Sequence, residues 1–303
     1  MILLYHNIIP DNSPLERYCV GQALLQSVFE RQIKWLIEHY KIVSLTEYLA
    51  SPCYPKRDGL KRIAITFDDG FDIAFQCIYP FIVRNAIPVT IFITTGHLER
   101  GNLLWFSYLK ALCFENQYKF LEVNQATFWL NTLEQKIHGW NNLRAYARED
   151  GDPVGFCRKL SERYPIDATV SSTYQGMTYE QIKLAVNSGL FELDAHTIIH
   201  PYLTGLSKKE QEQEIIGSKR ALYALTGQPV RYFAYPGGEY DQTTLEIVNQ
   251  GGYEGAFAII PQKLGYPLFE IERIGIYSQS FLKFQLKILG VSSFARRFGL
   301  KVG

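Results

Sequence analysis

The feature that most constrains this sequence is a repeated alternation between short apolar runs and longer segments of helical period. In a βα unit the strand is buried on both faces and reads as a nearly continuous apolar run, and the helix after it covers the sheet. The alternation therefore predicts an α/β fold, either a (β/α) barrel or a mostly parallel open sheet. The runs predicted as strands are residues 2–6, 42–44, 62–67, 89–94, 191–196, 231–235, 253–259 and 271–276.

Two of the intervening helices have readable ends. Residues 178–181 and 207–210 have the form of a capping box, in which a hydroxyl and the residue three positions later satisfy each other's backbone amides. Gly189 and Gly227 stand where these helices would stop, because glycine readily adopts the left-handed conformation that follows a helix.

Length and composition narrow the class of protein. A chain of 303 residues can form one large barrel, and 47% hydrophobic with 20% charged residues is typical of a soluble globular protein. The 31 Lys and Arg against 30 Asp and Glu leave a formal charge of +1, which argues against a nucleic-acid partner. The five cysteines form no CxxC pair and are odd in number, so we expect them to be reduced.

The two ends of the chain bear on its location. The first residues, Met-Ile-Leu-Leu-Tyr-His, lack the basic and apolar regions of a signal peptide, which predicts a cytoplasmic protein. Residues 281–303 interleave apolar side chains with lysines and arginines. A basic amphipathic tail of this kind predicts peripheral contact with the inner face of the membrane. The alternative is a terminal helix packed on the barrel with a solvated basic face.

A stretch from about residue 99 to 176 interrupts the alternation. It carries helical segments without an obvious β-rich run, and we interpret it as a mainly helical insertion in a single catalytic barrel of residues 1–280. It contains Trp105, Trp129 and Trp140, three of the four tryptophans. These aromatic side chains could cap a pocket or bind a sugar face, and the alternative is that they form the core of a small helical subdomain.

The first candidate for chemistry is the run 63–70, Ile-Ala-Ile-Thr-Phe-Asp-Asp-Gly. Burying an acid is costly, so a buried strand that ends in Asp68 and Asp69 indicates a site at the strand terminus. Gly70 would allow a turn that brings both carboxylates toward one cleft. One carboxylate could then bind a cation while the other takes a proton from water. The same letters also form an ordinary turn.

The second candidate is a predicted strand that ends in His196 and His200, four residues apart and followed by Pro201. Two imidazoles at this spacing can share a metal if the chain turns after the first, and two histidines with one carboxylate are a usual ligand set of hydrolytic zinc sites. Two solvated histidines remain the alternative.

The third candidate is the run 231–238, Arg-Tyr-Phe-Ala-Tyr-Pro-Gly-Gly, read as a strand that enters a tight turn. Glycine there would let a backbone amide approach a ligand closely, as an oxyanion hole requires. Arg231 could pair with a carboxylate and lower its pKa so that it stays a base. A plain strand–turn connection explains the same residues.

Together the three runs resemble the motifs of the polysaccharide deacetylases of carbohydrate esterase family four, which share the NodB homology domain. Thr-Phe-Asp-Asp-Gly, His-Thr-x-x-His-Pro and Arg-x-Phe-x-x-Pro occur here in the family's order, and the resemblance covers about residues 1–275 apart from the insertion. It implies a distorted (β/α) barrel of about seven strands with the site at the carboxyl ends. It also implies metal-dependent removal of acetyl groups from N-acetylated sugars.

The resemblance implies a role for each matching residue. Asp68 matches the catalytic base, and the metal ligands match Asp69, His196 and His200. Gly237 falls where the family uses a backbone amide for the oxyanion. We expect the neighbouring Tyr235 and Pro236 to contact substrate and Arg231 to support the base.

One family motif is missing, because no histidine follows His200 to serve as the general acid. The opening Tyr-His resembles a permuted branch of the family that includes deacetylases of biofilm sugars. We therefore expect His6 to protonate the leaving amine, and a buried structural histidine is the alternative.

The function predicted from the sequence is hydrolysis of the N-acetyl group of an N-acetylhexosamine in a polysaccharide, oligosaccharide or lipid-linked sugar. The expected cofactor is a divalent ion, zinc first, with cobalt, nickel or iron also compatible with two histidines and one aspartate. The alternatives are an amidohydrolase of small acylated amines and a sugar-binding barrel without activity. The oligomeric state and the role of the insertion are left open.

Overall fold

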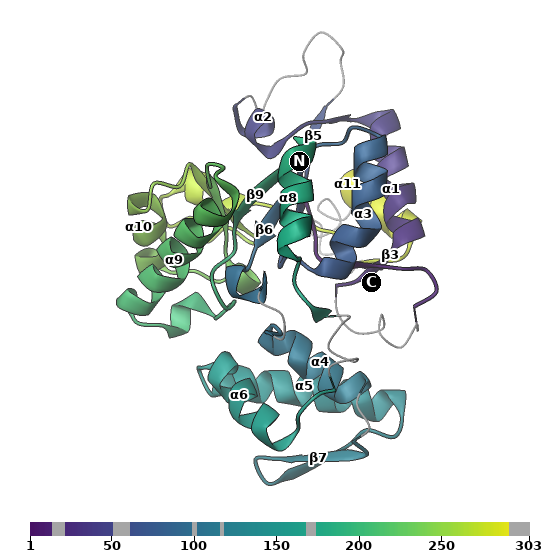
Figure 1. Ribbon diagram of the computed structural model, residues 1–303, viewed down its shortest axis with the longest axis vertical. Helices are drawn as coiled ribbons and strands as arrows, with labels where there is room; N and C mark the ends of the chain where they lie inside the picture. Colours follow the sequence, from purple (N-terminus) through teal and green to yellow (C-terminus); the bar gives the residue numbers. More distant parts are fainter. Residues whose placement is uncertain (14–21, 51–60, 99–101, 116–117, 168–173, 291–303) are drawn as a thin grey trace.

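The structure is a computed structural model that describes residues 1–13, 22–50, 61–98, 102–115, 118–167 and 174–290 (Figure 1). Its centre is a parallel sheet with the strand order β12-β11-β10-β9-β6-β5-β1-β13, and β4 pairs with β5 beside this path. The strands of this sheet are β1 (Ile2–Tyr5), β4 (Lys41–Ile42), β5 (Arg62–Phe67), β6 (Val89–Ile93), β9 (Phe191–Ala195), β10 (Tyr232–Ala234), β11 (Gly255–Ala258), β12 (Ile271–Glu272) and β13 (Ile274–Gly275).

The sheet curls into a nearly closed, distorted (β/α) barrel, which confirms the predicted fold. The two ends of the strand order, β12 and β13, are consecutive in the chain, with only Arg273 between them. The run predicted as one strand at 271–276 is therefore split. Its first half pairs with β11 and its second half with β1, so Arg273 lies at the seam of the barrel.

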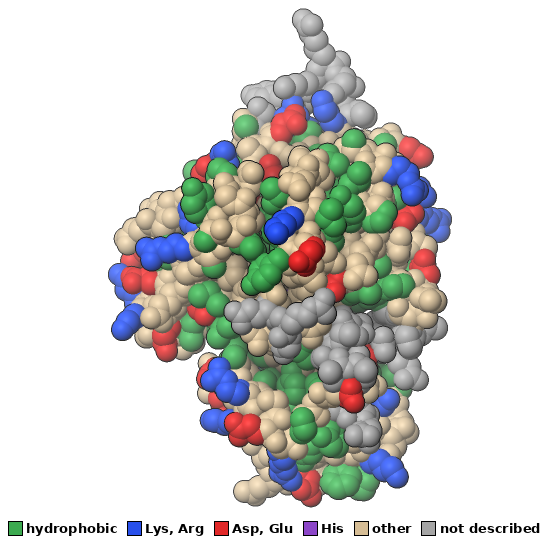
Figure 2. Space-filling model, in the orientation of Figure 1, with side chains coloured by type: hydrophobic (Ala, Val, Ile, Leu, Met, Phe, Trp, Pro, Cys, Tyr) green, Lys and Arg blue, Asp and Glu red, His purple; other side chains and the backbone are tan. Residues whose placement is uncertain are grey.

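Apolar residues fill both faces of the sheet, as the continuous apolar runs of the sequence require. Ile2, Ala64 and Phe257 belong to a cluster on one face, whereas Leu3 and Ile65 belong to the larger cluster between the strands and the helices. Successive strand residues alternate between the two clusters because side chains alternate across a sheet. On the face drawn in Figure 2, acidic and basic side chains are interspersed.

Helices cover the outside of the sheet, with α1, α3 and α8 near one another and α9 and α10 beside them past β9 (Figure 1). Both predicted capping boxes are present, and Gly189 and Gly227 adopt left-handed conformations. The helices are α1 (Gln26–His39), α2 (Leu45–Ala50), α3 (Asp72–Arg84), α8 (Tyr179–Ser188), α9 (Lys208–Thr226), α10 (Gln242–Gln250) and α11 (Phe281–Ile288), with 3-10 turns η2 (Thr95–Leu98), η4 (Leu203–Gly205), η5 (Pro236–Gly238) and η6 (Pro267–Phe269).

The part of the chain between β6 and α8 lies below the barrel in Figure 1. It contains α4 (Trp105–Phe114), α5 (Leu133–Glu149) and α6 (Pro153–Arg163) and has a buried cluster of its own. It also contains an antiparallel hairpin of β7 (Phe120–Val123) and β8 (Ala126–Trp129), which the sequence did not indicate. We call this part the insertion, and the division of the chain into domains stays a prediction. A two-stranded sheet of β2 (Ile8–Ile9) and β3 (Leu24–Leu25) completes the strands.

The structure describes only the first part of the predicted basic tail, residues 281–290. In α11, Phe284 and Ile288 are buried, whereas Leu282 is 63% exposed. Residues 291–303 lie outside the described residues, and membrane contact stays a prediction. Among the described residues no helix combines the length and apolar character needed to cross a bilayer.

The cysteines within the described residues are unpaired. Cys77, Cys113 and Cys157 are buried free thiols. Cys19 and Cys53 lie outside the described residues.

Candidate active site

The two adjacent aspartates follow β5 at the carboxyl end of the barrel. The Asp68 amide still donates to the Tyr5 carbonyl oxygen, as a continuation of the β1–β5 ladder. The chain then turns sharply, since Asp69 and Gly70 both have a φ of +74°. The left-handed conformation costs about 1–3 kcal/mol at a residue other than glycine, so the surrounding structure must hold Asp69 in place. This turn brings both carboxylates into one cleft, as the sequence predicted.

The two histidines lie on the neighbouring loop after β9. The amide of His196 continues the ladder to the Ile93 carbonyl. Thr197 and His200 both have positive φ values, so the loop coils tightly between the two imidazoles. The carboxylate of Glu214, on α9, accepts hydrogen bonds from the amides of Ile198 and Ile199 at 2.8 and 3.1 Å. Glu214 thereby fixes the loop that carries both imidazoles.

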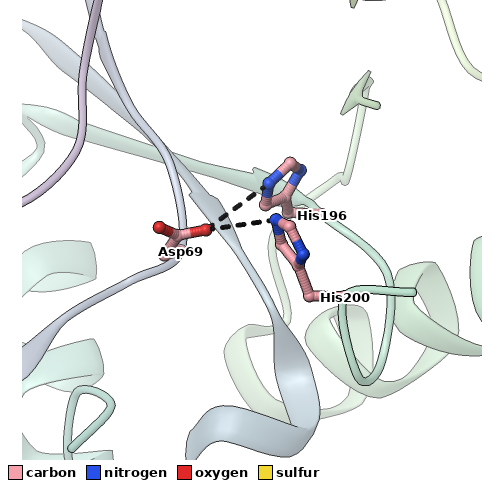
Figure 3. Close-up of side chains that lie close together, drawn as sticks. All are labelled: Asp69, His196 and His200. Carbon is pink, nitrogen blue, oxygen red and sulfur yellow. Dashed lines mark ion pairs between the residues drawn. The ribbon is translucent and has the colours of Figure 1, made fainter. Parts of the chain in front are cut away.

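Asp69, His196 and His200 point toward one another (Figure 3). Oδ1 of Asp69 lies 3.6 Å from Nε2 of each histidine, and one ligand atom from each residue lies within 4.8 Å of the others. Ligand atoms about 2.0–2.2 Å from a tetrahedral ion lie roughly 3.4 Å apart, close to this spacing. Asp69 Oδ1 is buried with no hydrogen-bond partner among the described residues. The three residues therefore form a site that could bind a metal ion.

The protonation states suit metal binding. Nδ1 of His196 lies 2.8 Å from the Ala234 carbonyl oxygen, so this nitrogen carries the proton and Nε2 presents its lone pair. Burial lowers the pKa of both imidazoles, which keeps them neutral. Burial and the nearby Asp68 carboxylate raise the pKa of Asp69 well above its usual value. A cation at this position would offset that cost, because it favours the ionised carboxylate.

The carboxylate of Asp68 is held by Arg273 at the barrel seam. The guanidinium donates two parallel hydrogen bonds, of 2.6 and 2.7 Å, and both side chains are buried. Burial alone would raise the pKa of Asp68, but the Arg273 guanidinium and the nearby His196 lower it to about 2. Asp68 is therefore a carboxylate at neutral pH, with Nε2 of His196 3.9 Å from its Oδ2.

The predicted role of Arg231 is wrong. Its guanidinium pairs with Glu254 at 3.1 Å on the surface, and its side chain is 43% exposed. Arg231 precedes β10 at the opposite end of that strand from the site, where its backbone amide donates to Asp194 and its carbonyl oxygen accepts from the Glu254 amide. Arg273 takes the position beside the base that was expected of Arg231.

A cavity of about 300 Å³ joins the remaining predicted residues except Pro236. The predicted residues that line it are His6, Asp68, Asp69, His196, His200, Tyr235 and Gly237. Pro236 is buried and is not one of the lining residues, and the Tyr235 hydroxyl donates to the Phe269 carbonyl. Gly237 has a φ of +63°, a conformation that favours glycine, in the turn η5.

His6 lies on the rim of the same cavity, just after β1. Its ring is 5.8 Å from that of Tyr277, and its Nδ1 atom is buried without a hydrogen-bond partner among the described residues. Burial lowers the pKa of His6 to about 4, although the Asp68 carboxylate opposes this. In the absence of substrate the imidazole is therefore neutral at pH 7.

The insertion closes the other side of the cavity. Trp105 is buried in the insertion core, and its indole donates to the His200 carbonyl at 3.0 Å. The Phe106 ring packs 5.0 Å from the His200 ring. Trp140 also lines the cavity, whereas Trp129 lies on the hairpin and is 52% exposed. Both interpretations of these aromatics hold in part, because Trp105 is at once a core residue and a wall of the cavity.

Sequence reasoning missed Arg273 and Glu214, and it left open whether the insertion reaches the site. Arg273 stands in a strand-like run beside a second charged residue, Glu272, which is exposed, so the sequence does not show which of the two is buried and paired. Glu214 sits on an amphipathic helix with other acids, and nothing in the sequence distinguishes it. The wall from the insertion depends on how two separately packed parts of the chain meet.

The fold and the site together are those of a (β/α) barrel with a cluster that could bind a metal ion at the carboxyl ends of its strands. The chain matches the polysaccharide deacetylase family over residues 56–256, and it belongs to that family. Its members are hydrolases that act on amide bonds, and this class agrees with the predicted one.

Two curated relatives are similar in sequence. The putative polysaccharide deacetylase YxkH of Bacillus subtilis (strain 168) is 22% identical over 254 residues, which are 84% of this chain and 62% of that protein. The poly-beta-1,6-N-acetyl-D-glucosamine N-deacetylase of Staphylococcus aureus (strain N315) is 40% identical over 84 residues, 26% of this chain and 28% of that protein. This chain thus matches less than two thirds of either relative's length.

Solved structures share the fold. The Streptococcus pyogenes deacetylase PplD, in complex with acetate, has a TM-score of 0.61 at 19% identity and covers 94% of this chain and 96% of its own. IcaB from Ammonifex degensii has a TM-score of 0.59 at 18% identity and covers 95% of this chain and 94% of its own. At these identities the likeness establishes the barrel architecture.

Proposed function

We propose that this chain hydrolyses the N-acetyl group of N-acetylhexosamine residues in a glycan, with a divalent cation held by Asp69, His196 and His200. The observation that carries the proposal is the joint geometry of the cluster. Three ligand atoms lie within 4.8 Å of one another, beside a second carboxylate that Arg273 keeps ionised. The name of the Staphylococcus aureus relative supports N-acetylglucosamine as the sugar.

When bound, the cation supplies Lewis-acid chemistry, which polarises the acetyl carbonyl and makes water a better nucleophile. Zinc fits the ligand set, and cobalt, nickel and iron also do. Asp68 accepts the proton of the attacking water, a role that requires the ionised carboxylate that Arg273 maintains. The Gly237 amide donates to the oxygen on which negative charge develops.

His6 delivers a proton to the leaving amine. Its pKa of about 4 means that it does not hold this proton before the reaction at pH 7. Because the pKa of Asp68 is lower, about 2, the proton taken from water moves favourably from Asp68 toward His6. His6 and Asp68 then act in sequence on one proton, and no external acid is needed.

Acetate release from N-acetylated oligosaccharides, measured with and without chelator, tests the proposal. Asp68→Asn should retain zinc, measured by metal analysis, yet lose turnover, whereas His196→Ala should lose both. Arg231→Gln is the matched control, because this residue lies on the surface away from the cavity. Normal turnover by Asp68→Asn would refute the base assignment. Zinc-bound protein without turnover on any acetylated sugar or small amide would favour a binding barrel.

A further inference from the structure

The side of the cavity contributed by the insertion differs chemically from the side contributed by the barrel. The barrel supplies carboxylates and imidazoles. The insertion supplies aromatic rings and cations, and its lining residues are Trp105, Phe106, Ser107 and Lys110 on α4 and Trp140, Arg144 and Arg148 on α5. We call Lys110, Trp140, Arg144 and Arg148 the basic wall.

The basic wall is organised by helix geometry. Trp140, Arg144 and Arg148 are spaced four residues apart on α5, and side chains at this spacing share one helix face. The guanidinium of Arg144 lies 4.5 Å from the centre of the Trp140 ring. That of Arg148 lies 5.0 Å from the centre of the Tyr202 ring. These stacking contacts orient both cations beside the cavity.

The charges on the two sides do not cancel. Arg148 is paired with Glu239, which also lines the cavity. Asp68 is neutralised by Arg273, and Asp69 belongs to the metal cluster. Among the described residues no carboxylate forms an ion pair with Arg144. Arg144 therefore gives the basic wall a positive charge that no described carboxylate pairs, next to the site of hydrolysis.

The hydrogen-bonding side chains of the basic wall are all donors. Lysine, arginine and the tryptophan indole donate hydrogen bonds and accept none. Nε1 of Trp140 is buried without a hydrogen-bond partner among the described residues. An unpaired buried donor is costly, so a ligand that supplies an acceptor there gains affinity. A wall of donors with positive charge suits an anionic group, and a guanidinium matches the oxygens of a phosphate well.

We propose that the basic wall binds a phosphate carried by the glycan next to the acetylated sugar, so that the preferred substrate is a phosphate-bearing N-acetylated glycan. This inference rests on the proposed function and names the substrate class of the same site. The cavity, at about 300 Å³, is at the small end of ligand sites and suits one sugar with one substituent. Arg144, above the Trp140 ring, is the central contact.

The test compares acetate release from an N-acetylglucosamine oligosaccharide with release from the same oligosaccharide bearing one phosphate monoester. The zinc-loaded full chain should prefer the phosphorylated substrate by about 10-fold in kcat/KM, since a charge-assisted contact by an exposed arginine falls at the low end of its range. Arg144→Gln should remove most of this preference, because kcat/KM for the phosphorylated substrate should fall by more than kcat/KM for the neutral one. Added salt should weaken the preference.

Arg158→Gln is the matched control, because Arg158 is an exposed arginine of the insertion, on α6, that does not line the cavity. It should retain the preference. Equal kcat/KM for the two substrates in the unmutated protein, or equal losses in the two variants, would overturn the proposal.

A binding measurement separates this inference from the proposed function. If neither oligosaccharide releases acetate, calorimetry of the same two compounds still reports on the basic wall. Tighter binding of the phosphorylated compound that is lost in Arg144→Gln and kept in Arg158→Gln would support the anion site even though the deacetylase assignment had failed. Equal binding of both compounds would overturn it.

Discussion

The pairing of Arg273 with Asp68 can be tested by a double-mutant cycle. The Asp68 carboxylate is buried, and Arg273→Gln removes the positive charge that stabilises its ionised form. Burial should then raise the pKa of Asp68 above the ordinary 3.8. A change from about 2 to 3.8 corresponds to about 2.5 kcal/mol, at about 1.4 kcal/mol for each pH unit. We therefore expect a coupling energy of at least about 2.5 kcal/mol between the two side chains.

Urea unfolding of the metal-free protein at pH 7 measures the cycle of Arg273→Gln, Asp68→Asn and the double variant. Arg273→Gln alone should cost about 3–5 kcal/mol, because it leaves a buried charge without its partner. The double variant should be more stable than the sum of the single losses predicts. Arg231→Gln should change stability by less than about 1 kcal/mol, since it removes an exposed pair.

The pH dependence of the free energy of unfolding is an independent check of the Asp68–Arg273 pairing. The folded-state pKa of Asp68 is depressed, so its contribution is fully present above pH 3.8 and is lost as the pH falls through about 2. Asp68→Asn should remove this part of the profile. Additive single losses, within about 0.5 kcal/mol, would refute the reasoning.

Three further changes test other parts of the site. Gly96→Ala would place a Cβ atom 2.7 Å from the Ile198 carbonyl oxygen, so the loop between the imidazoles must shift and zinc affinity, measured by chelator competition, should fall at least about 10-fold. Glu214→Gln weakens the acceptor for two loop amides and should lower the free energy of unfolding in urea by about 1 kcal/mol. The folded-state pKa of His6 is lowered from 6.5 to about 4, so its stabilising effect is present above pH 6.5 and is lost toward pH 4. Metal-free protein should lose up to about 3 kcal/mol over that range, and an unchanged unfolding profile in His6→Gln would contradict this.

The parts of the fold that could be predicted are those with local signals. The apolar runs predicted the barrel strands, and the capping boxes and glycines predicted where α8 and α9 begin and end. The hairpin β7–β8 was missed because its strands alternate exposed and buried residues over only four positions each. The single strand expected at 271–276 failed because one buried arginine divides it.

The site residues that lie within the three sequence motifs could be predicted, apart from Arg231, and those outside the motifs could not. Asp69, His196 and His200 converge because parallel strands place their carboxyl ends at one edge of the sheet. Arg231 was misassigned because it stands before β10, at the amino end of the strand, whereas the site lies at the carboxyl end. Its replacement, Arg273, lies 205 positions from Asp68 in the chain, and no local pattern links residues so far apart.

The position of Arg273 also assigns two features of the site to different parts of the chain. The three candidate ligands all precede the last barrel strands, so a chain that ends before residue 273 contains all three of them. Such a fragment lacks the guanidinium that keeps the neighbouring acid ionised. The ligand cluster and the ionised base therefore depend on different segments of the chain, and the base depends on the segment that joins the two ends of the strand order.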